Sequence, residues 1–242
     1  MLTKTKFLEI LNKILSNGNL VKKEKEHLES IKETADLLPE EILVDLLIEK
    51  LGLITIKGVT DEDGYFKEFV NTINNNEQES QTEIFYLLKG KQVSCLHTLD
   101  TTETWNWHGG KEIYIFIFKK DQKPEKITLN ETNPIYTIEK NTLFGAKIAT
   151  LRDNIDYALV TCLCKPGFLR EHYTNPTKNE IDILYKKYPE FEKIIGELTP
   201  KMPNTSKNIF QSIFQLFTCC IGVKKNQDEI NEPLINSSLN NP

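Results

Sequence analysis

Two histidines and one glutamate lie within a dozen residues of each other in the segment from residue 90 to residue 110, which also holds both tryptophans. His97 belongs to an alternating polar and apolar run, and Glu103 follows it across an Asp-Thr-Thr turn. An imidazole and a carboxylate can together bind a divalent metal ion, or they can act as an acid–base pair. His97 and Glu103 are therefore the candidate catalytic residues and the candidate metal ligands. The competing interpretation is a hydrogen-bonded pair that lines a polar pocket.

The two tryptophans follow Glu103 on the same predicted strand. Successive side chains of a strand point to opposite faces, so Trp105 and Trp107 share the face of Glu103. Their rings can stack on a sugar or a base, and filling of the core is the competing interpretation. His108 falls on the opposite face unless a bulge intervenes, and we interpret it as a surface or interface histidine.

These residues require a scaffold of strands, and the sequence predicts about eight. Short β-branched or aromatic runs recur between residues 82 and 164, with turn clusters between them and no helical periodicity. This spacing favours an antiparallel sandwich or barrel over a parallel sheet. The predicted strands are Thr82–Leu88, Val93–Leu99, Glu103–Trp107, Glu112–Phe118, Glu125–Leu129, Ile135–Ile138, Ala146–Leu151 and Asp156–Cys164.

Helical segments flank the predicted strands. Apolar residues recur at helical spacing before residue 38, again between Pro39 and Gly52, and in two segments, Asn179–Tyr188 and Phe191–Leu198. The central strand with alternating isoleucines and aromatic residues is apolar on both faces, so its outer face needs a cover from helices or from a second subunit. We expect three parts: an N-terminal helical extension at residues 1–38, a β domain with its flanking helices at residues 39–200, and a basic, apolar helix with a disordered tail at residues 201–242.

Composition narrows the class of protein. A net charge of -5 provides no basic surface for a phosphate backbone, so we expect no nucleic-acid partner. The chain has neither a run of about 20 apolar residues nor a signal-peptide pattern at its start. Five cysteines, an odd number without a secretory signal, indicate a reduced, cytoplasmic protein.

The C-terminal part carries a second distinctive pattern at residues 209–223. Its apolar residues fall on one face of a predicted helix, and lysines without acidic residues flank it. Cys219 and Cys220 adjoin two lysines, a context that suits palmitoylation and a peripheral membrane contact. The alternative is a helix that docks on the barrel or on the partner in a dimer.

Six stretches of the sequence occur in the same order as in one known family. The spacing of His97, Glu103 and Gly110 also resembles that of the family's first motif. Leu99 stands where the family's first motif has a second histidine, Phe144 stands where its second motif has another, and Asn141 replaces a turn glycine. The family is the fifth cupin family, a domain of unknown function, and the resemblance extends over residues 42–200. The six stretches are Leu47–Leu53, Gly64–Glu68, Thr82–Leu88, Ser94–Asp100, Thr102–Trp107 and Tyr157–Phe168.

The resemblance implies a mainly β fold, the cupin double-stranded β-helix or jelly roll with flanking α-helices. It also implies a homodimer and an architecture similar to that of dTDP-sugar epimerases, but no assigned reaction. His97 and Glu103 fall on metal-ligand positions of the family, whereas Leu99 and Phe144 cannot bind a metal ion. Tyr65, in the matched stretch before the barrel, is expected at the mouth of the pocket.

Three functions remain open at this point. The first is binding of a small polar, sugar-like ligand in the barrel, without turnover, by a set of five side chains. The second is an isomerase or epimerase reaction carried by His97 and Glu103, with or without a divalent metal. The third is a dimeric scaffold attached to membranes through the C-terminal helix. Loss of two family ligands favours the first or the third. The five side chains of the first are His97, Glu103, Trp105, Trp107 and Tyr65.

Overall fold

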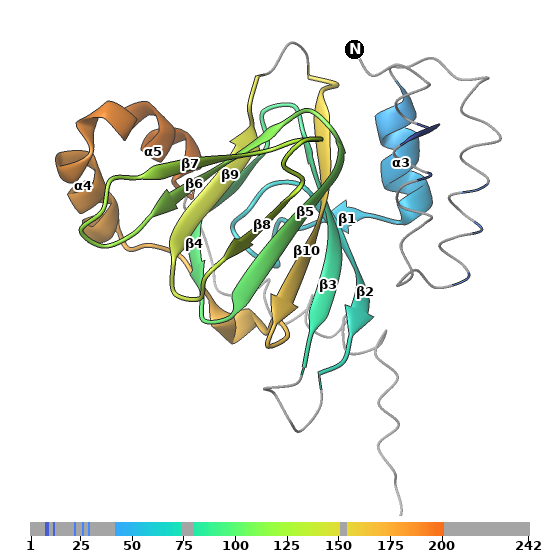
Figure 1. Cartoon of the computed structure of the whole chain (residues 1–242), viewed down its shortest axis with the longest axis horizontal. Coiled ribbons are helices and arrows are strands. Elements are labelled where there is room, and N and C mark those ends of the chain that lie inside the picture. The colour runs from blue at the N-terminus through green and yellow to red at the C-terminus, as the bar shows by residue number, and fades with distance from the viewer. Residues whose placement is uncertain are drawn as a thin grey trace, which may run out of the picture. The chain divides into compact units, whose positions relative to one another are not determined.

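The computed structural model describes residues 42–73, 80–150 and 154–200, together with six positions between residues 8 and 29. Its strands form two antiparallel sheets packed face to face (Figure 1). The six-stranded sheet contains, in spatial order, β1 (Ile54–Thr55), β2 (Tyr65–Asn71), β3 (Thr82–Lys89), β10 (Tyr157–Lys165), β5 (Thr102–Gly110) and β8 (Ile135–Ile138). The five-stranded sheet contains β11 (Tyr173–Thr174), β4 (Val93–Leu99), β9 (Leu143–Ile148), β6 (Ile113–Phe118) and β7 (Glu125–Leu129).

The connections give the jelly-roll architecture that the sequence predicts. From β3 to β11 the chain changes sheet at every connection except the β6–β7 hairpin. All eight predicted strands are present, although the one predicted at Ala146–Leu151 begins earlier, at Leu143. Asn141 adopts a left-handed conformation with φ of 60°, as its place in the turn before β9 requires. The short strands β1 and β11 lie at the sheet edges, where two residues of each pair with β2 and β4, respectively.

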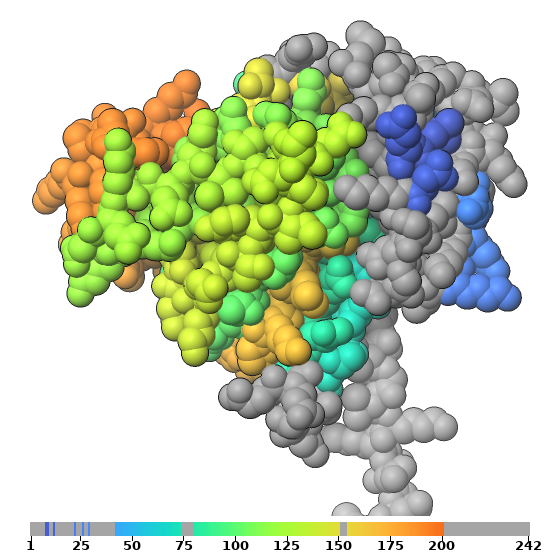
Figure 2. All heavy atoms as spheres, viewed as in Figure 1, coloured from blue at the N-terminus to red at the C-terminus, as the bar shows by residue number. Residues whose placement is uncertain are grey.

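The barrel interior is a continuous apolar core made by the inward faces of both sheets. Alternation along each strand places apolar residues inside, and Trp105 and Phe144 are the bulkiest of these side chains that are almost completely buried. In the space-filling view the strand side chains close over this interior on the visible face (Figure 2). Burial of these rings removes a large apolar area from water and supplies most of the driving force for folding.

Helices cover the outer face of each sheet. α3 (Leu43–Leu51) packs its leucines on the six-stranded sheet, against Phe85 and Leu159, and Gly52 ends it in a left-handed conformation. α4 (Lys178–Lys187) and α5 (Glu192–Leu198) cover the five-stranded sheet (Figure 1). Phe116 and Phe118 of β6 contact these two helices, which therefore provide the cover that this doubly apolar strand requires.

Several predicted segments lie outside the described residues. The six described positions between residues 8 and 29 are helical, but the division of the chain at residues 38 and 200 stays a prediction. The predicted helix at residues 209–223, with Cys219 and Cys220, also lies outside the described part. Among the helices that are described, none combines the length and the apolar character needed to cross a membrane.

Candidate functional site

His97 points into the barrel near one end, and its neighbours fix the orientation of its ring. The pairing of β4 with β9 shifts between Ser94 and His97, and His97 Nδ1 donates a hydrogen bond to the main-chain oxygen of Cys95 at 2.7 Å. A carbonyl oxygen can only accept, so Nδ1 carries the proton and Nε2 is the acceptor of the neutral ring. The ring contacts Phe144 at 4.2 Å and stacks on Tyr173 at 4.8 Å, between centroids.

Glu62, which the sequence analysis missed, lies beside His97 on the loop between β1 and β2. Its Oε1 accepts a hydrogen bond from Ser94 Oγ at 2.6 Å, and its Oε2 accepts one from Thr60 Oγ1 at 3.1 Å. Oε1 is also 4.0 Å from His97 Nδ1. Glu62 is 8% exposed, so its carboxylate is held almost entirely by protein groups. An acidic residue directly before a strand of a matched stretch was the only sequence signal for it.

Glu103 projects from β5 into the same end of the barrel. Its Oε2 accepts a hydrogen bond from Trp105 Nε1 at 2.8 Å. Burial raises the pKa of Glu103 to about 7, with a further increase from Glu62 and a partial opposing effect from His97 and Trp105. The carboxyl group is therefore divided between its neutral and charged forms near neutral pH, which suits it to donate or accept a proton.

We refer to Glu62, His97 and Glu103 as the polar cluster. Although Glu103 and His97 affect each other electrostatically, no hydrogen bond joins these two described residues, and His97 lies against Glu62 instead. The cluster thus brings together the two candidates from the sequence and adds a second carboxylate. Three ionisable groups at one end of an otherwise apolar interior are unusual, because burial of charge is costly without a compensating partner.

Of the three aromatic residues predicted to bind a ligand, only one lies at the polar cluster. Trp105 lines the polar cluster and packs edge-on against Tyr86, with ring centroids 5.8 Å apart. Trp107 also faces the interior, but its Nε1 donates to the main-chain oxygen of Lys111 at 2.9 Å, at the other end of β5. Tyr65 packs with the leucines under α3, on the outer face of the six-stranded sheet, so the structure does not bring it to the cluster.

His108 corrects one expectation from the sequence. It points away from Glu103, as predicted, and its Nε2 is 3.2 Å from Thr161 Oγ1, although the pairing of β5 with β10 shifts at this point. The predicted surface position is wrong, since His108 is only 4% exposed. Phe85, the cross-strand neighbour of Thr161, belongs to the core under α3, so this outer face of the sheet is covered rather than open to solvent.

The donor set does not form a metal centre. Among the described residues, no group of three or more histidine, cysteine, aspartate or glutamate side chains is placed to hold a metal ion. His97 uses Nδ1 for a main-chain contact, and Phe144 presents an aromatic ring to it where the family resemblance implies a histidine. The buried thiols of Cys162 and Cys164 have raised pKa values, chiefly through burial, which disfavours the thiolates that bind metal ions.

The segment after β10 closes this end of the barrel. Gly167 N and Phe168 N donate hydrogen bonds to Ser80 Oγ and Thr82 Oγ1, each at 2.9 Å, which anchor the segment on the six-stranded sheet. The chain then crosses to the other sheet, where Tyr173 pairs with Leu99 of β4. This crossing places the Tyr173 ring against His97, so Tyr173 is a second residue at the site that the sequence analysis did not identify.

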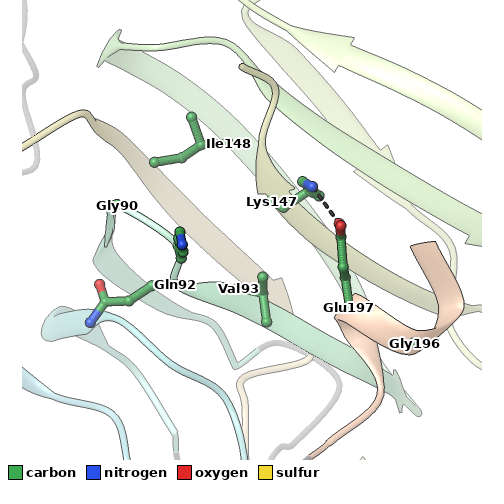
Figure 3. A pocket seen from close by; sticks show the side chains of 8 residues that line it. Gly90, Gln92, Val93, Lys147, Ile148, Gly196 and Glu197 are labelled. Atoms are coloured by element: carbon green, nitrogen blue, oxygen red, sulfur yellow. Dashed lines mark hydrogen bonds and ion pairs between the residues drawn. The ribbon is translucent and has the colours of Figure 1, made fainter. Parts of the chain in front are cut away.

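A separate groove of about 320 Å³ lies outside the barrel, between the β3–β4 turn, β9 and α5. Lys147 of β9 and Glu197 of α5 point toward each other at this groove, with Nζ and Oε2 2.5 Å apart (Figure 3). No residue of the polar cluster lines it. The ion pair joins α5 to the sheet, so we interpret the groove as part of the helix attachment.

Comparisons with known proteins agree with this architecture. Residues 45–175 match the family model described as Cupin superfamily (DUF985). A crystal structure of a protein from Shewanella oneidensis is 21% identical, with a TM-score of 0.55, over 65% of this chain and 98% of that one. A hypothetical protein from Leishmania major is 24% identical, with a TM-score of 0.53, over 65% and 98% of the two chains.

A looser likeness links the chain to oxalate decarboxylase from Bacillus subtilis, at 13% identity and a TM-score of 0.41, over 59% of this chain and 37% of that one. A search of the curated proteins finds no match. The two closer structural neighbours share the fold, and the family match extends over more than half of the chain. The protein therefore belongs to the cupin superfamily, in the family designated DUF985.

Proposed function

We propose that this protein binds a small polar, sugar-like ligand at the polar cluster, without turnover. The observation that carries the proposal is the burial of Glu62, His97 and Glu103 together at one end of the barrel. Each of these groups loses hydration on folding, and at Glu103 the effect of burial on the pKa exceeds that of the hydrogen bond and the charge that favour the carboxylate. Groups retained at such a cost are typical of binding sites, where a ligand supplies the missing partners.

The surroundings of the cluster suit a ligand with both hydroxyl groups and an apolar face. The carboxylates of Glu62 and Glu103 can accept hydrogen bonds from hydroxyl groups. The aromatic side chains of Trp105 and Tyr173 lie beside the cluster, and aromatic surroundings suit the apolar face of a sugar ring.

An NMR titration of the ¹⁵N-labelled protein tests the proposal. We expect glucose, glucosamine or glucuronate to shift the amide resonances of β4 and β5, and we expect Glu103→Gln to weaken this binding about tenfold, since one charged hydrogen-bond acceptor is lost. Glu197→Gln, in the outer groove, is the matched control and should bind as the wild type does. Shifts confined to the outer groove, or none with any of the three sugars, would contradict the proposal.

The pKa of Glu103 supports a second candidate, an isomerase or epimerase reaction. A carboxyl group that titrates near pH 7 can remove a proton from a carbon next to a carbonyl group. Epimerisation is completed when a second group, for which His97 is the candidate, donates a proton to the opposite face of the enolate. Incubation with a 4-keto sugar nucleotide in D₂O should then introduce deuterium at that carbon, and Glu103→Gln should abolish the exchange. An equal rate of exchange in both proteins would exclude Glu103 as the base.

A further inference from the structure

Tyr173 carries a buried polar atom that the fold leaves without a partner. Its side chain is 5% exposed, and its hydroxyl group makes no hydrogen bond among the described residues. The side-chain oxygen of Asn175, two residues further along the same segment, is in the same situation. Buried polar atoms are nearly always hydrogen-bonded, and each exception calls for an explanation such as a bound molecule.

The Tyr173 side chain lies next to the polar cluster. Its ring stacks on His97 at an interplanar angle of 17°. Burial raises the pKa of Tyr173, and among the acidic neighbours Glu62 contributes most to this rise, followed by Cys95 and Asp61. Asn175 donates a hydrogen bond from Nδ2 to Asp61, which holds the Asn175 side chain beside the acidic loop before β2.

The charges around this point are predominantly negative. Asp61, Glu62 and Glu103 contribute carboxylates, and Glu62 receives its hydrogen bonds from neutral hydroxyl groups. The nearby cation is Arg170, whose Nη1 donates to the main-chain oxygen of Tyr173 at 3.1 Å and whose guanidinium lies over the Tyr173 ring at 4.9 Å. Arg170 is thus directed at the main chain and at the ring rather than at a carboxylate.

We propose that the ligand of this site presents an organic ammonium group, held between the Glu62 carboxylate and the Tyr173 hydroxyl. This inference rests on the proposed function, which requires a ligand at the polar cluster. An ammonium group has three donors and a positive charge, so it complements a site that offers acceptors, negative charge and aromatic rings. An anionic ligand would be repelled by the carboxylates, and the described residues provide no set of three ligands for a metal ion.

Three small probes of similar size separate the possibilities: ethanolamine, ethylene glycol and glycolate. In NMR titrations at neutral pH we expect ethanolamine to bind at least about tenfold more tightly than ethylene glycol, and glycolate to bind least, because a charged hydrogen bond is stronger than a neutral one. Glu62→Gln and Tyr173→Phe should each weaken ethanolamine binding about tenfold.

Tyr157→Phe is the matched control. Tyr157 also has a buried hydroxyl without a partner among the described residues, but it lies in the core under α3. This variant should bind ethanolamine as the wild type does. Tyr173→Phe removes an unpartnered oxygen, so its melting temperature should be unchanged or higher, which separates loss of binding from loss of folding.

The outcomes distinguish the two proposals. Equal or tighter binding of ethylene glycol or glycolate at the cluster would overturn the ammonium inference and leave the proposed function standing. Ethanolamine binding that survives both Glu62→Gln and Tyr173→Phe would also overturn it. If none of the three probes binds, the ammonium inference fails, while the sugar titration decides the proposed function separately.

Discussion

The pKa of the Glu103 carboxyl group is set by its burial in the barrel and by the groups around it. Its neighbours come from different elements: His97 on β4, Glu62 on the loop before β2, Trp105 on β5 and Cys162 on β10. Burial disfavours the charged form of Glu103 and raises its pKa. His97 and the hydrogen bonds from Trp105 and Cys162 lower the pKa only in part. The same carboxyl group therefore links ligand binding, proton transfer and stability.

The pH dependence of unfolding follows from this raised pKa. The folded protein holds the Glu103 proton up to about pH 7, whereas the unfolded chain releases it near the ordinary value of 4.5. Between these values the folded state binds more protons, so stability falls as pH rises, by roughly 3 kcal/mol in total. Glu103→Gln should remove this slope, and urea unfolding at pH 5 and pH 8 measures it. An identical slope in both proteins would show that Glu103 titrates normally.

Single residues also show how far the sequence determines the site. The inward positions of His97, Glu103 and Trp105 follow from strand alternation, which a run of seven or more residues displays clearly. Glu62 and Tyr173 lie in segments too short or too irregular for periodicity, and their positions depend on how those segments close onto the barrel. The aromatic contact of Phe144 with His97 depends likewise on pairing between β4 and β9.

Among the secondary-structure elements, the close pairing of β5 with β10 limits which residues fit at their ends. Gly110 has a φ of 91°, and a Cβ atom there would lie 2.2 Å from the main-chain oxygen of Tyr157. The strands could not keep their spacing around such an atom. The family motif that ends at Gly110 therefore has a steric reason in this fold, independent of any ligand.

We expect Gly110→Ala to destabilise the protein by about 3 kcal/mol or more, since it combines an unfavourable φ with a main-chain clash. Gly52→Ala is the control, because Gly52 also has a positive φ of 66° but its Cβ would meet nothing closer than 4.0 Å. That variant should lose only about 1 kcal/mol. Urea denaturation of both variants tests the difference, and equal losses would show that the clash is relieved by a small shift of β10.

Eight of the described strands and the α-helices beside them were predictable from their periodicity and turn signals, whereas β1, β2 and β11 were not predicted. The helices after β10 were predicted within one residue of their observed limits, since α4 has a capping box at Thr177 and α5 follows Pro189 closely. The pairing order of the strands was not available from periodicity alone, because it depends on contacts between distant segments. The family resemblance implied the jelly-roll architecture, and the structure gives the order.

At the scale of the whole molecule, two expectations concern assembly and location. The resemblance implies a homodimer, so sedimentation velocity of the full chain should give a particle of twice the 28.0 kDa chain mass. A single species of the chain mass at micromolar concentration would contradict it. The barrel supplies its own cover for both sheets, so a dimer is not required to bury the outer face of β6.

The membrane hypothesis rests on residues 209–223, outside the described part of the chain. If Cys219 and Cys220 are palmitoylated, changing both to serine should move the protein from the membrane fraction to the supernatant of eukaryotic cells that express it. The predicted helix at residues 209–223 would then be the remaining anchor, and a single weak anchor binds a membrane only reversibly. Lys201→Ser with Lys207→Ser, which leaves the cysteines intact, is the comparison. An unchanged distribution of the cysteine variant would exclude lipid attachment there.

The polar cluster and the Tyr173 ring beside it bring together residues from early and late parts of the domain sequence. Glu62 precedes most of the strands, and Tyr173 belongs to β11, which follows all the others. During synthesis the chain emerges from its N-terminus, so the strands up to β10 can pair before Tyr173 is available to stack on His97. The site is consequently completed only after the strands up to β10 have been synthesised. A fragment that stops after β10 would contain His97 and both carboxylates and would still lack one wall of the site.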